Sequence, residues 1–210
     1  MYLYMTLGNM NQVKKCLTLL CCFIMVNQIW AQGNKRSIKY NIKALGMNLG
    51  QFSVLQNSQG GRVSIEGVTD VEVKLFFTYQ VKYIQKTIHE DGRLVSSHLQ
   101  TMKNGKVNSD TWLIADTNNY ILIQEGDTSL IHDDISYTGS LLYFNEPVHA
   151  KFLYKEKSGE KRGVRVIGEH KYALVNDEGK TTHEYTFKDG IMVYAKIKYP
   201  LADIHLEYCQ

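Results

Sequence analysis

The sequence predicts an all-β protein, an antiparallel meander of about ten strands. Apolar and polar residues alternate along most of the chain, as where Ile38, Tyr40 and Ile42 are separated by Lys39 and Asn41. A period of two places one face of each strand in a core and the other in water. Dipeptides that end in glycine separate the alternating runs and predict tight hairpins. The three- and four-residue spacing of an amphipathic helix does not occur in these runs.

The first 31 residues have the order of a cleavable secretory signal peptide. Lys14 and Lys15 precede an apolar run over 16–26, and the small residue Ala31 follows at the expected cleavage position. The run is shorter than the roughly 20 apolar residues of a transmembrane helix, so we expect no membrane span after cleavage. Met10 lies just before the lysines, and residues 1–9 are a candidate extension upstream of the true start.

Cleavage leaves a short linker over 32–36 and one β-rich domain over 37–210, within the usual size of a single domain. Only Cys209 of the four cysteines remains, so the mature chain cannot form an internal disulfide. An exported domain of this kind favours a bacterial envelope and predicts a periplasmic or secreted protein. Loss of the two signal-peptide lysines leaves basic and acidic residues almost equal in number, which argues against nucleic acid as a partner.

The alternating runs follow one another along the mature chain. The first covers 38–44, and the longest has an apolar or aromatic residue at every odd position from Val71 to Tyr83. Two more cover 191–199 and 204–208. Six hairpin dipeptides lie between runs: Asp91-Gly92, Asn104-Gly105, Glu125-Gly126, Ser158-Gly159, Glu178-Gly179 and Asp189-Gly190.

A sheet of about ten strands with one apolar face has to bury that face on itself. The meander connections and the lack of helices predict that the sheet closes into a lipocalin-sized barrel. A two-layer β-sandwich is the alternative.

The segment Leu142-Tyr143-Phe144-Asn145-Glu146-Pro147, with the shorter stretches 44–46, 73–77, 104–106 and 170–172 in the same order, resembles a domain-of-unknown-function family of exported Bacteroidetes proteins. The resemblance covers essentially 37–198. It implies a secreted or periplasmic all-β envelope protein, and it supplies no activity or catalytic residues.

Tyr143, Phe144 and Glu146 are the candidate ligand-binding residues. On a strand, Phe144 and Glu146 would share one face and Tyr143 the other, with apolar groups on both sides just before Pro147, which is typical of a buried strand. A buried carboxylate has to be paired or hydrogen-bonded, or its pKa shifts. Glu146 therefore either holds a corner by bonding backbone amides or serves a site.

No motif predicts catalytic residues, a metal or a cofactor. His132, Asp133 and Asp134 are adjacent, but neighbours on a strand point to opposite faces, so a polar loop is the preferred interpretation of them. No Gly-x-Ser-x-Gly elbow, P-loop or dinucleotide glycine pattern occurs. Tyrosines are frequent, Tyr83 and Tyr185 among them, and suit a pocket rim, a sugar-binding face or, preferably, half-exposed strands.

Two functions follow from a barrel. It can be a carrier or binder of an apolar or lipid-like small molecule in the envelope, because a barrel of about eight or more strands can hold one. Alternatively, side chains such as Phe77, Trp112 and Phe144 fill the interior, and the outer surface binds another envelope protein or a glycan. An enzyme ranks third, because no nucleophile is paired with a base in the sequence.

Overall fold

The computed structural model describes residues 33–74 and 78–209, in which fourteen strands form one antiparallel sheet. The expected signal peptide, 1–31, lies outside the described residues. The first strand begins at Asn34, inside the expected linker. The strands are β1 (Asn34–Ala44), β2 (Met47–Gln59), β3 (Arg62–Lys74), β4 (Thr78–Glu90), β5 (Arg93–Lys103), β6 (Lys106–Asp116), β7 (Asn119–Gln124), β8 (Asp127–Ile131), β9 (Phe152–Tyr154), β10 (Lys161–Gly168), β11 (Lys171–Val175), β12 (Thr181–Lys188), β13 (Ile191–Ile197) and β14 (Ile204–Tyr208).

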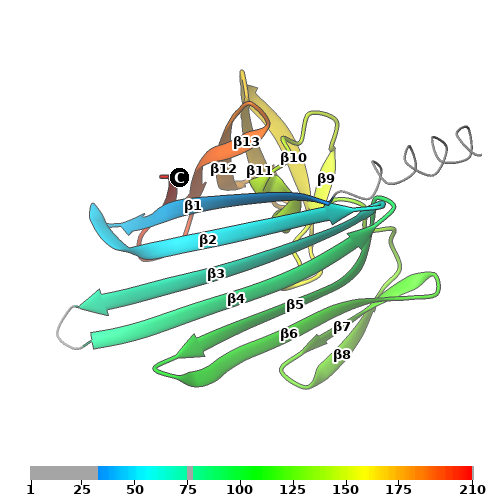
Figure 1. Cartoon of the computed structure of the whole chain (residues 1–210), viewed down its shortest axis with the longest axis horizontal. Helices are drawn as coiled ribbons and strands as arrows, with labels where there is room; N and C mark the ends of the chain where they lie inside the picture. Colours follow the sequence, from blue (N-terminus) through cyan, green and yellow to red (C-terminus); the bar gives the residue numbers. More distant parts are fainter. Residues whose placement is uncertain (1–32, 75–77, 210) are drawn as a thin grey trace, which may run out of the picture.

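The first and last strands of the chain meet in the middle of the sheet. Consecutive strands pair from β1 to β8 and from β9 to β14, and β1 pairs with β14, where Tyr40 lies opposite Tyr208. The long strands β1 to β6 run side by side, and β9 to β13 turn back behind them (Figure 1). The meander therefore has two arms, one formed by β1 to β8 and the other by β9 to β14. The core lies between them.

The predicted antiparallel meander is confirmed, but the sheet is an open curl. The strands β8 and β9 form its two edges and do not pair with each other in the described ranges. The segment that follows β8 bridges part of the gap. The Leu94 amide donates to the Ile135 carbonyl at 2.8 Å, and the Tyr154 amide donates to the Tyr137 carbonyl at 2.9 Å. This segment thereby connects β5 with β9.

A short 3₁₀ helix, η2 (Gly139–Tyr143), packs against the main apolar cluster inside the curl. Its Leu142 is 1% exposed and packs in the main apolar cluster with Ile65 and Leu153, which belong to opposite arms of the sheet. The arms are also connected by Tyr40, whose hydroxyl donates to the Met192 carbonyl at 2.9 Å. The core therefore depends on a non-strand segment between the arms.

The described residues form more strands than the glycine dipeptides predict. All six dipeptides do lie between consecutive strands, and Asp91 and Gly92 have the φ values of 48° and 79° that a type I′ hairpin turn requires. Other turns place Leu45, Thr117 and His170 in the left-handed region, at φ of 52°, 46° and 54°. Leucine, threonine and histidine are not typical turn residues. The strands on either side of these turns could therefore not be predicted as separate strands from the sequence.

The longest alternating run is two strands rather than one. Residues Val71 to Lys74 end β3, and β4 begins at Thr78 after residues 75–77, which lie outside the described part of the chain. Because Val71 pairs with Val81, the odd-numbered residues of both strands share a face, and the alternation of β4 is in phase with that of β3.

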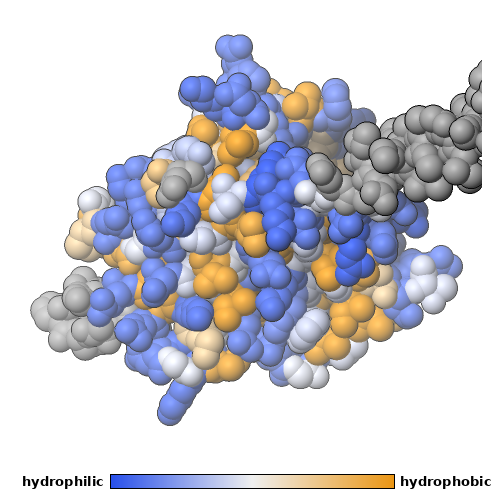
Figure 2. All heavy atoms as spheres, viewed as in Figure 1, coloured by the Kyte–Doolittle hydropathy of each residue, from blue (hydrophilic) through white to orange (hydrophobic). Residues whose placement is uncertain are grey.

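The outer face of the long strands carries charged and apolar side chains together (Figure 2). Trp112 belongs to this face, so the expectation that it fills the interior is wrong. Its neighbours Thr111 and Leu113 point inward on β6, whereas Trp112 is 40% exposed and stacks on His98 with ring centroids 3.9 Å apart. Phe77, expected beside it, lies outside the described residues. Within 33–74 and 78–209, no helix combines the length and the apolar character needed to cross a membrane.

Candidate functional site

The expected strand around Tyr143, Phe144 and Glu146 is wrong, because this segment is the end of η2 and the turn after it. The Leu141 carbonyl accepts hydrogen bonds from the amides of Phe144 and Asn145, at 3.2 and 3.0 Å. These local bonds replace a strand ladder. Apolar residues on consecutive positions fit a turn buried on all sides as well as they fit a buried strand.

The three candidate residues have different surroundings. Tyr143 packs edge-on against Phe52 with ring centroids 5.3 Å apart, and burial raises the pKa of its phenol. Phe144 is 2% exposed and lies in the core with the Arg36 guanidinium 4.9 Å from its ring centroid. Glu146 lines a separate hollow to which neither Tyr143 nor Phe144 contributes. The structure therefore does not bring the three residues into one site.

Glu146 bonds two side chains of the β10–β12 region rather than backbone amides. The Tyr172 hydroxyl donates to its Oε1 at 2.7 Å, and His170 Nδ1 lies 3.0 Å from the same oxygen. The Glu146 side chain is only 10% exposed. The hydrogen bond to Glu146 and its negative charge raise the pKa of His170. Burial, followed by the separate hydrogen bond from Tyr172 to Glu146, raises the pKa of Tyr172 to about 12. These contacts support a structural role.

We expect Glu146→Gln to lower the free energy of unfolding by about 1 to 3 kcal/mol, the usual effect of losing a charged hydrogen bond. Because the folded state raises the pKa of His170, its contribution is present below the ordinary histidine pKa and is lost as pH rises through the raised value. The loss should therefore be larger in mildly acidic than in alkaline buffer. Urea denaturation measures it, with Glu178→Gln on an exposed turn as control. Equal stability of both variants would contradict the structural role.

A cavity of about 170 Å³ lies inside the curl, beside η2 and between the two arms of the sheet. This volume is close to that of an engineered apolar cavity that binds benzene. Part of the wall is apolar, and these residues come from η2 and from strands of both arms: Leu99, Leu142, Leu153, Leu174, Met192, Ile197 and Leu206. The remaining wall is polar and aromatic.

Glu156 is the buried carboxylate of this cavity. It is 4% exposed, and its Oε1 accepts hydrogen bonds from the Ser140 amide at 2.8 Å and from Gln85 Nε2 at 3.3 Å. A side chain at position 139 would approach its Oε2, since a Cβ on Gly139 would lie 3.1 Å from it. Glu156 forms no ion pair within the described ranges, and the adjacent Lys155 pairs with Glu160 instead. A buried carboxylate with two bonds on one oxygen is incompletely compensated.

Buried polar side chains continue from Glu156 along the inner face of β4 and β5. Thr138 Oγ1 lies 3.0 Å from Ser140 Oγ and 3.3 Å from Nε2 of His89, and Thr87 Oγ1 lies 2.9 Å from Ser97 Oγ. His89 is 2% exposed, its Nδ1 has no partner among the described residues, and burial lowers its pKa to about 4. This network holds the segment before η2 against β4.

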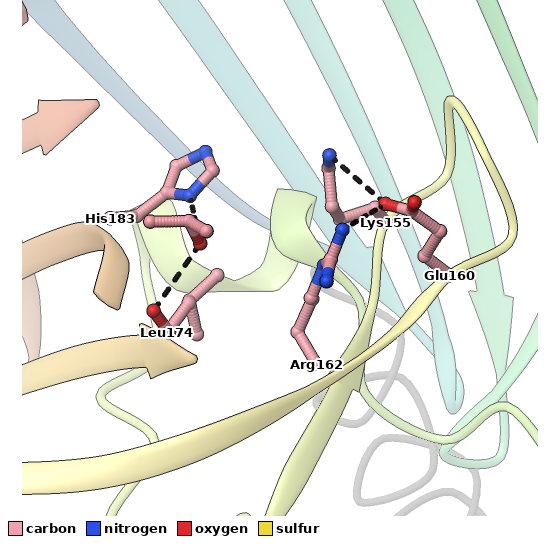
Figure 3. A network of polar contacts seen from close by, with 6 residues as sticks. Lys155, Glu160, Arg162, Leu174 and His183 are labelled. Atoms are coloured by element: carbon pink, nitrogen blue, oxygen red, sulfur yellow. Dashed lines mark hydrogen bonds and ion pairs between the residues drawn. The ribbon is translucent and has the colours of Figure 1, made fainter. Parts of the chain in front are cut away.

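Lys155, Lys157 and His183 also line the cavity, the two lysines on the loop after β9 and the histidine on β12. Arg162 Nη2 and Lys155 Nζ donate to Glu160 Oε2 at 2.6 and 3.3 Å, and His183 lies on a separate strand (Figure 3). The Thr182 hydroxyl donates to the Leu174 carbonyl at 3.3 Å, so its oxygen accepts from His183 Nδ1 at 2.9 Å. Burial, then the charges of Lys155 and Arg162, lower the pKa of His183 to about 4. His183 is therefore neutral, with Nε2 as an acceptor.

A second hollow, of about 780 Å³, lies outside the core around the loop from Pro147 to Lys151. Glu146 lines it, together with Phe152, which is 52% exposed. Lys161 Nζ lies 5.0 Å from the Phe152 ring centroid, within the range of a cation–π contact. Of the three predicted residues, Tyr143 lines the inner cavity and Glu146 lines this outer hollow.

The adjacent residues 132–134 bond to three separate partners. His132 Nδ1 lies 2.7 Å from Asn119 Oδ1, Asp133 pairs with Lys161 at 3.4 Å, and Asp134 pairs with Arg93 at 3.0 Å. The described part of the chain contains no group of three or more His, Cys, Asp or Glu side chains that could hold a metal ion.

The model of one protein family, described as Domain of unknown function (DUF6134), matches residues 40–209. The chain belongs to this family. The DUF6134 match includes both arms of the sheet, η2 and all residues of the inner cavity. The resemblance to a domain-of-unknown-function family is thereby confirmed.

The fold of the DUF6134 chain is similar to that of a solved structure titled "Crystal Structure of Beta-barrel-like Protein of Domain of Unknown Function DUF1849 from Brucella abortus". The TM-score is 0.56 over 86% of this chain and 97% of that chain, at 10% sequence identity. At this identity the likeness shows the fold alone. No curated protein matches the DUF6134 chain in sequence.

Glu156, the most buried carboxylate of the described residues, was not among the candidate residues predicted from the sequence. Glu156 lies within a highly charged stretch, 155–162, that has the composition of a solvated turn. The frequent tyrosines were the one feature of the sequence that could have indicated the inner cavity, since Tyr83, Tyr143 and Tyr185 all line it. Their spacing in the sequence gives no indication that they converge.

Proposed function

We propose that this DUF6134 protein is an exported binding protein that holds a small, partly apolar ligand inside its curled sheet. The observation that carries the proposal is the inner cavity, which combines an apolar wall with a few convergent polar groups. Proteins bind small molecules in sites of this composition. The apolar wall includes Leu99 and Leu174, and the polar groups include Glu156 and His183.

The cavity limits the size of the ligand. A volume of about 170 Å³ is below the roughly 300 to 1,000 Å³ of sites for drug-sized ligands. A short-chain or single-ring molecule fits inside, whereas a long acyl chain would extend out of the curl. The proposed ligand is therefore a small amphiphile rather than a whole lipid.

Ile197→Trp tests this site, because Ile197 lines the cavity and is only partly buried, so that a larger ring can occupy the space. We expect calorimetry to detect binding of hexanol or benzyl alcohol to the wild type and at least roughly tenfold weaker binding to Ile197→Trp, since ring and ligand compete for one space. Val166→Trp, at a 66% exposed position of β10, is the matched control. Failure of both probes to bind, or unchanged binding to Ile197→Trp, would contradict the proposal.

Export is the other part of the proposal, and the arrangement of residues 14–31 supports it. The intact mass of the protein isolated from the envelope fraction of its host tests this part. We expect a chain that begins at Gln32. A chain that begins at Met1 or Met10 would contradict export with cleavage.

A second candidate function is an interaction module for an envelope protein or a glycan. The outer hollow favours it, because Val148 and Phe152 are 58% and 52% exposed there beside Lys161. Large apolar side chains grouped in a hollow are typical of interaction sites. Binding of a partner that survives Ile197→Trp would assign that binding to this outer surface.

A further inference from the structure

The inner cavity has one buried carboxylate, that of Glu156, which contacts Gln85 on β4. Glu156 is 4% exposed, forms no ion pair in the described residues and receives both of its hydrogen bonds on Oε1. Removing a carboxylate from water costs several kcal/mol unless an opposite charge or further hydrogen bonds compensate it. A cation beside Glu156 would supply that compensation.

The other polar groups of the wall are also suited to a cation. Tyr83, Tyr143 and Tyr185 line the cavity, and aromatic ring faces attract cations. Burial, and after it the charge of Glu156, raises the pKa of Tyr83 and of Tyr185, so both phenols stay neutral. His183 is neutral as well, and its Nε2 is an acceptor because Nδ1 donates to Thr182.

The nearby basic side chains do not take the place of that cation. Lys155 Nζ and Arg162 Nη2 both bond Glu160 Oε2, so one carboxylate on the loop after β9 already compensates them in part (Figure 3). Lys157 also lines the cavity, and neither lysine forms an ion pair with Glu156 in the described residues. Glu156 is therefore a buried carboxylate without a cationic partner in the part of the chain that the structure describes.

From this arrangement we propose that the ligand of the cavity carries an ammonium group, which binds against Glu156 among the tyrosine rings, while its short apolar part contacts Leu99 and Leu174. The inference rests on the proposed small-molecule site and names the chemical class of its ligand. An ammonium group has three donors and no acceptor, which complements the Oε2 of Glu156 and the Nε2 of His183. A preference for amines would also distinguish this site from a purely apolar cavity. Such a cavity would bind alcohols and amines according to their hydrocarbon part alone.

Three probes of equal chain length, hexylamine, hexanol and hexanoate, test the proposal by calorimetry on the mature protein. We expect hexylamine to bind at least about tenfold more tightly than hexanol, as a charge-assisted hydrogen bond provides. Hexanoate should bind most weakly, because it places a second carboxylate beside Glu156. Glu156→Gln should reduce the affinity for hexylamine to that for hexanol, since glutamine keeps the acceptor for the Ser140 amide and removes the charge.

Glu184→Gln is the control, because Glu184 is next to His183 on β12, pairs with Lys198 and is not part of the cavity wall. Equal affinities of the wild type for hexylamine and hexanol would overturn the ammonium inference and leave the binding site standing. Tighter binding of hexanoate would overturn it in favour of Lys155 and Lys157, which also line the cavity. If none of the three probes binds, both the inference and the proposed function fail. The comparison on the wild type holds even where Glu156→Gln does not fold.

Discussion

Leu142→Ala is expected to lower the free energy of unfolding by about 2 to 5 kcal/mol, the range for leucine truncation in a packed core. Leu142 is 1% exposed and packs in the cluster that both arms of the sheet share. The surroundings cannot easily close the space, because the network from Thr138 and Ser140 to Glu156 holds η2 in position. The truncated side chain would also enlarge the neighbouring cavity.

Equilibrium urea denaturation measures this effect, with Leu130→Ala on β8 as the matched control. Leu130 is 54% exposed, so its truncation should change stability by about 0.5 kcal/mol or less. If both variants lose the same stability, η2 is not the centre of the core, and the curl has to be held by strand pairing alone.

Acidification is expected to remove about 3 kcal/mol of stability through His89 alone. Burial lowers the pKa of His89 in the folded protein to about 4, below the ordinary value of about 6.5. The unfolded chain therefore binds the proton more readily, and the contribution of His89 is complete above the ordinary value and is lost as pH falls toward the lowered one. The folded protein cannot easily relax to accommodate the charge, because the ring is enclosed beside Thr138.

The experiment compares the wild type with His89→Gln by urea denaturation at neutral pH and near the lowered pKa. His183 and the carboxylates are common to both proteins, so the difference in acid sensitivity isolates His89. We expect the variant to lose less stability on acidification than the wild type. An identical loss in both proteins would mean that His89 does not titrate in this way.

The sequence determined the type and connection of the strands more completely than their number. Alternation is a local property, so β1 and β13 could be predicted from it, and glycine at positive φ marked turns such as Asp91-Gly92. The boundary between β3 and β4 could not be predicted, because Val71 and Val81 face the same side and the alternation in the sequence is not interrupted between the two strands. The open edges could not be predicted either, since β9 is bonded by a segment outside the strands, as in the contact of Tyr154 with Tyr137.

The candidate site was predictable only in part. Tyr143 does line a cavity, but on a 3₁₀ turn and not on the expected strand. Glu146 is held by Tyr172, a partner 26 residues away, and no local pattern announces that bond. The burial of Glu156 depends on Gln85, which is 71 residues away and comes from the other arm of the sheet. Contacts between the arms exist only after the sheet curls, so they leave no periodic signal in the sequence.

The inside of the curl, rather than its outer surface, is expected to hold the ligand. Crystallography of the protein purified from its own host distinguishes the two places. We expect electron density for a small non-protein molecule beside Glu156, in contact with the apolar wall around Leu174. Ligand density in the outer hollow beside Phe152, with the inner cavity closed by protein side chains, would contradict the account.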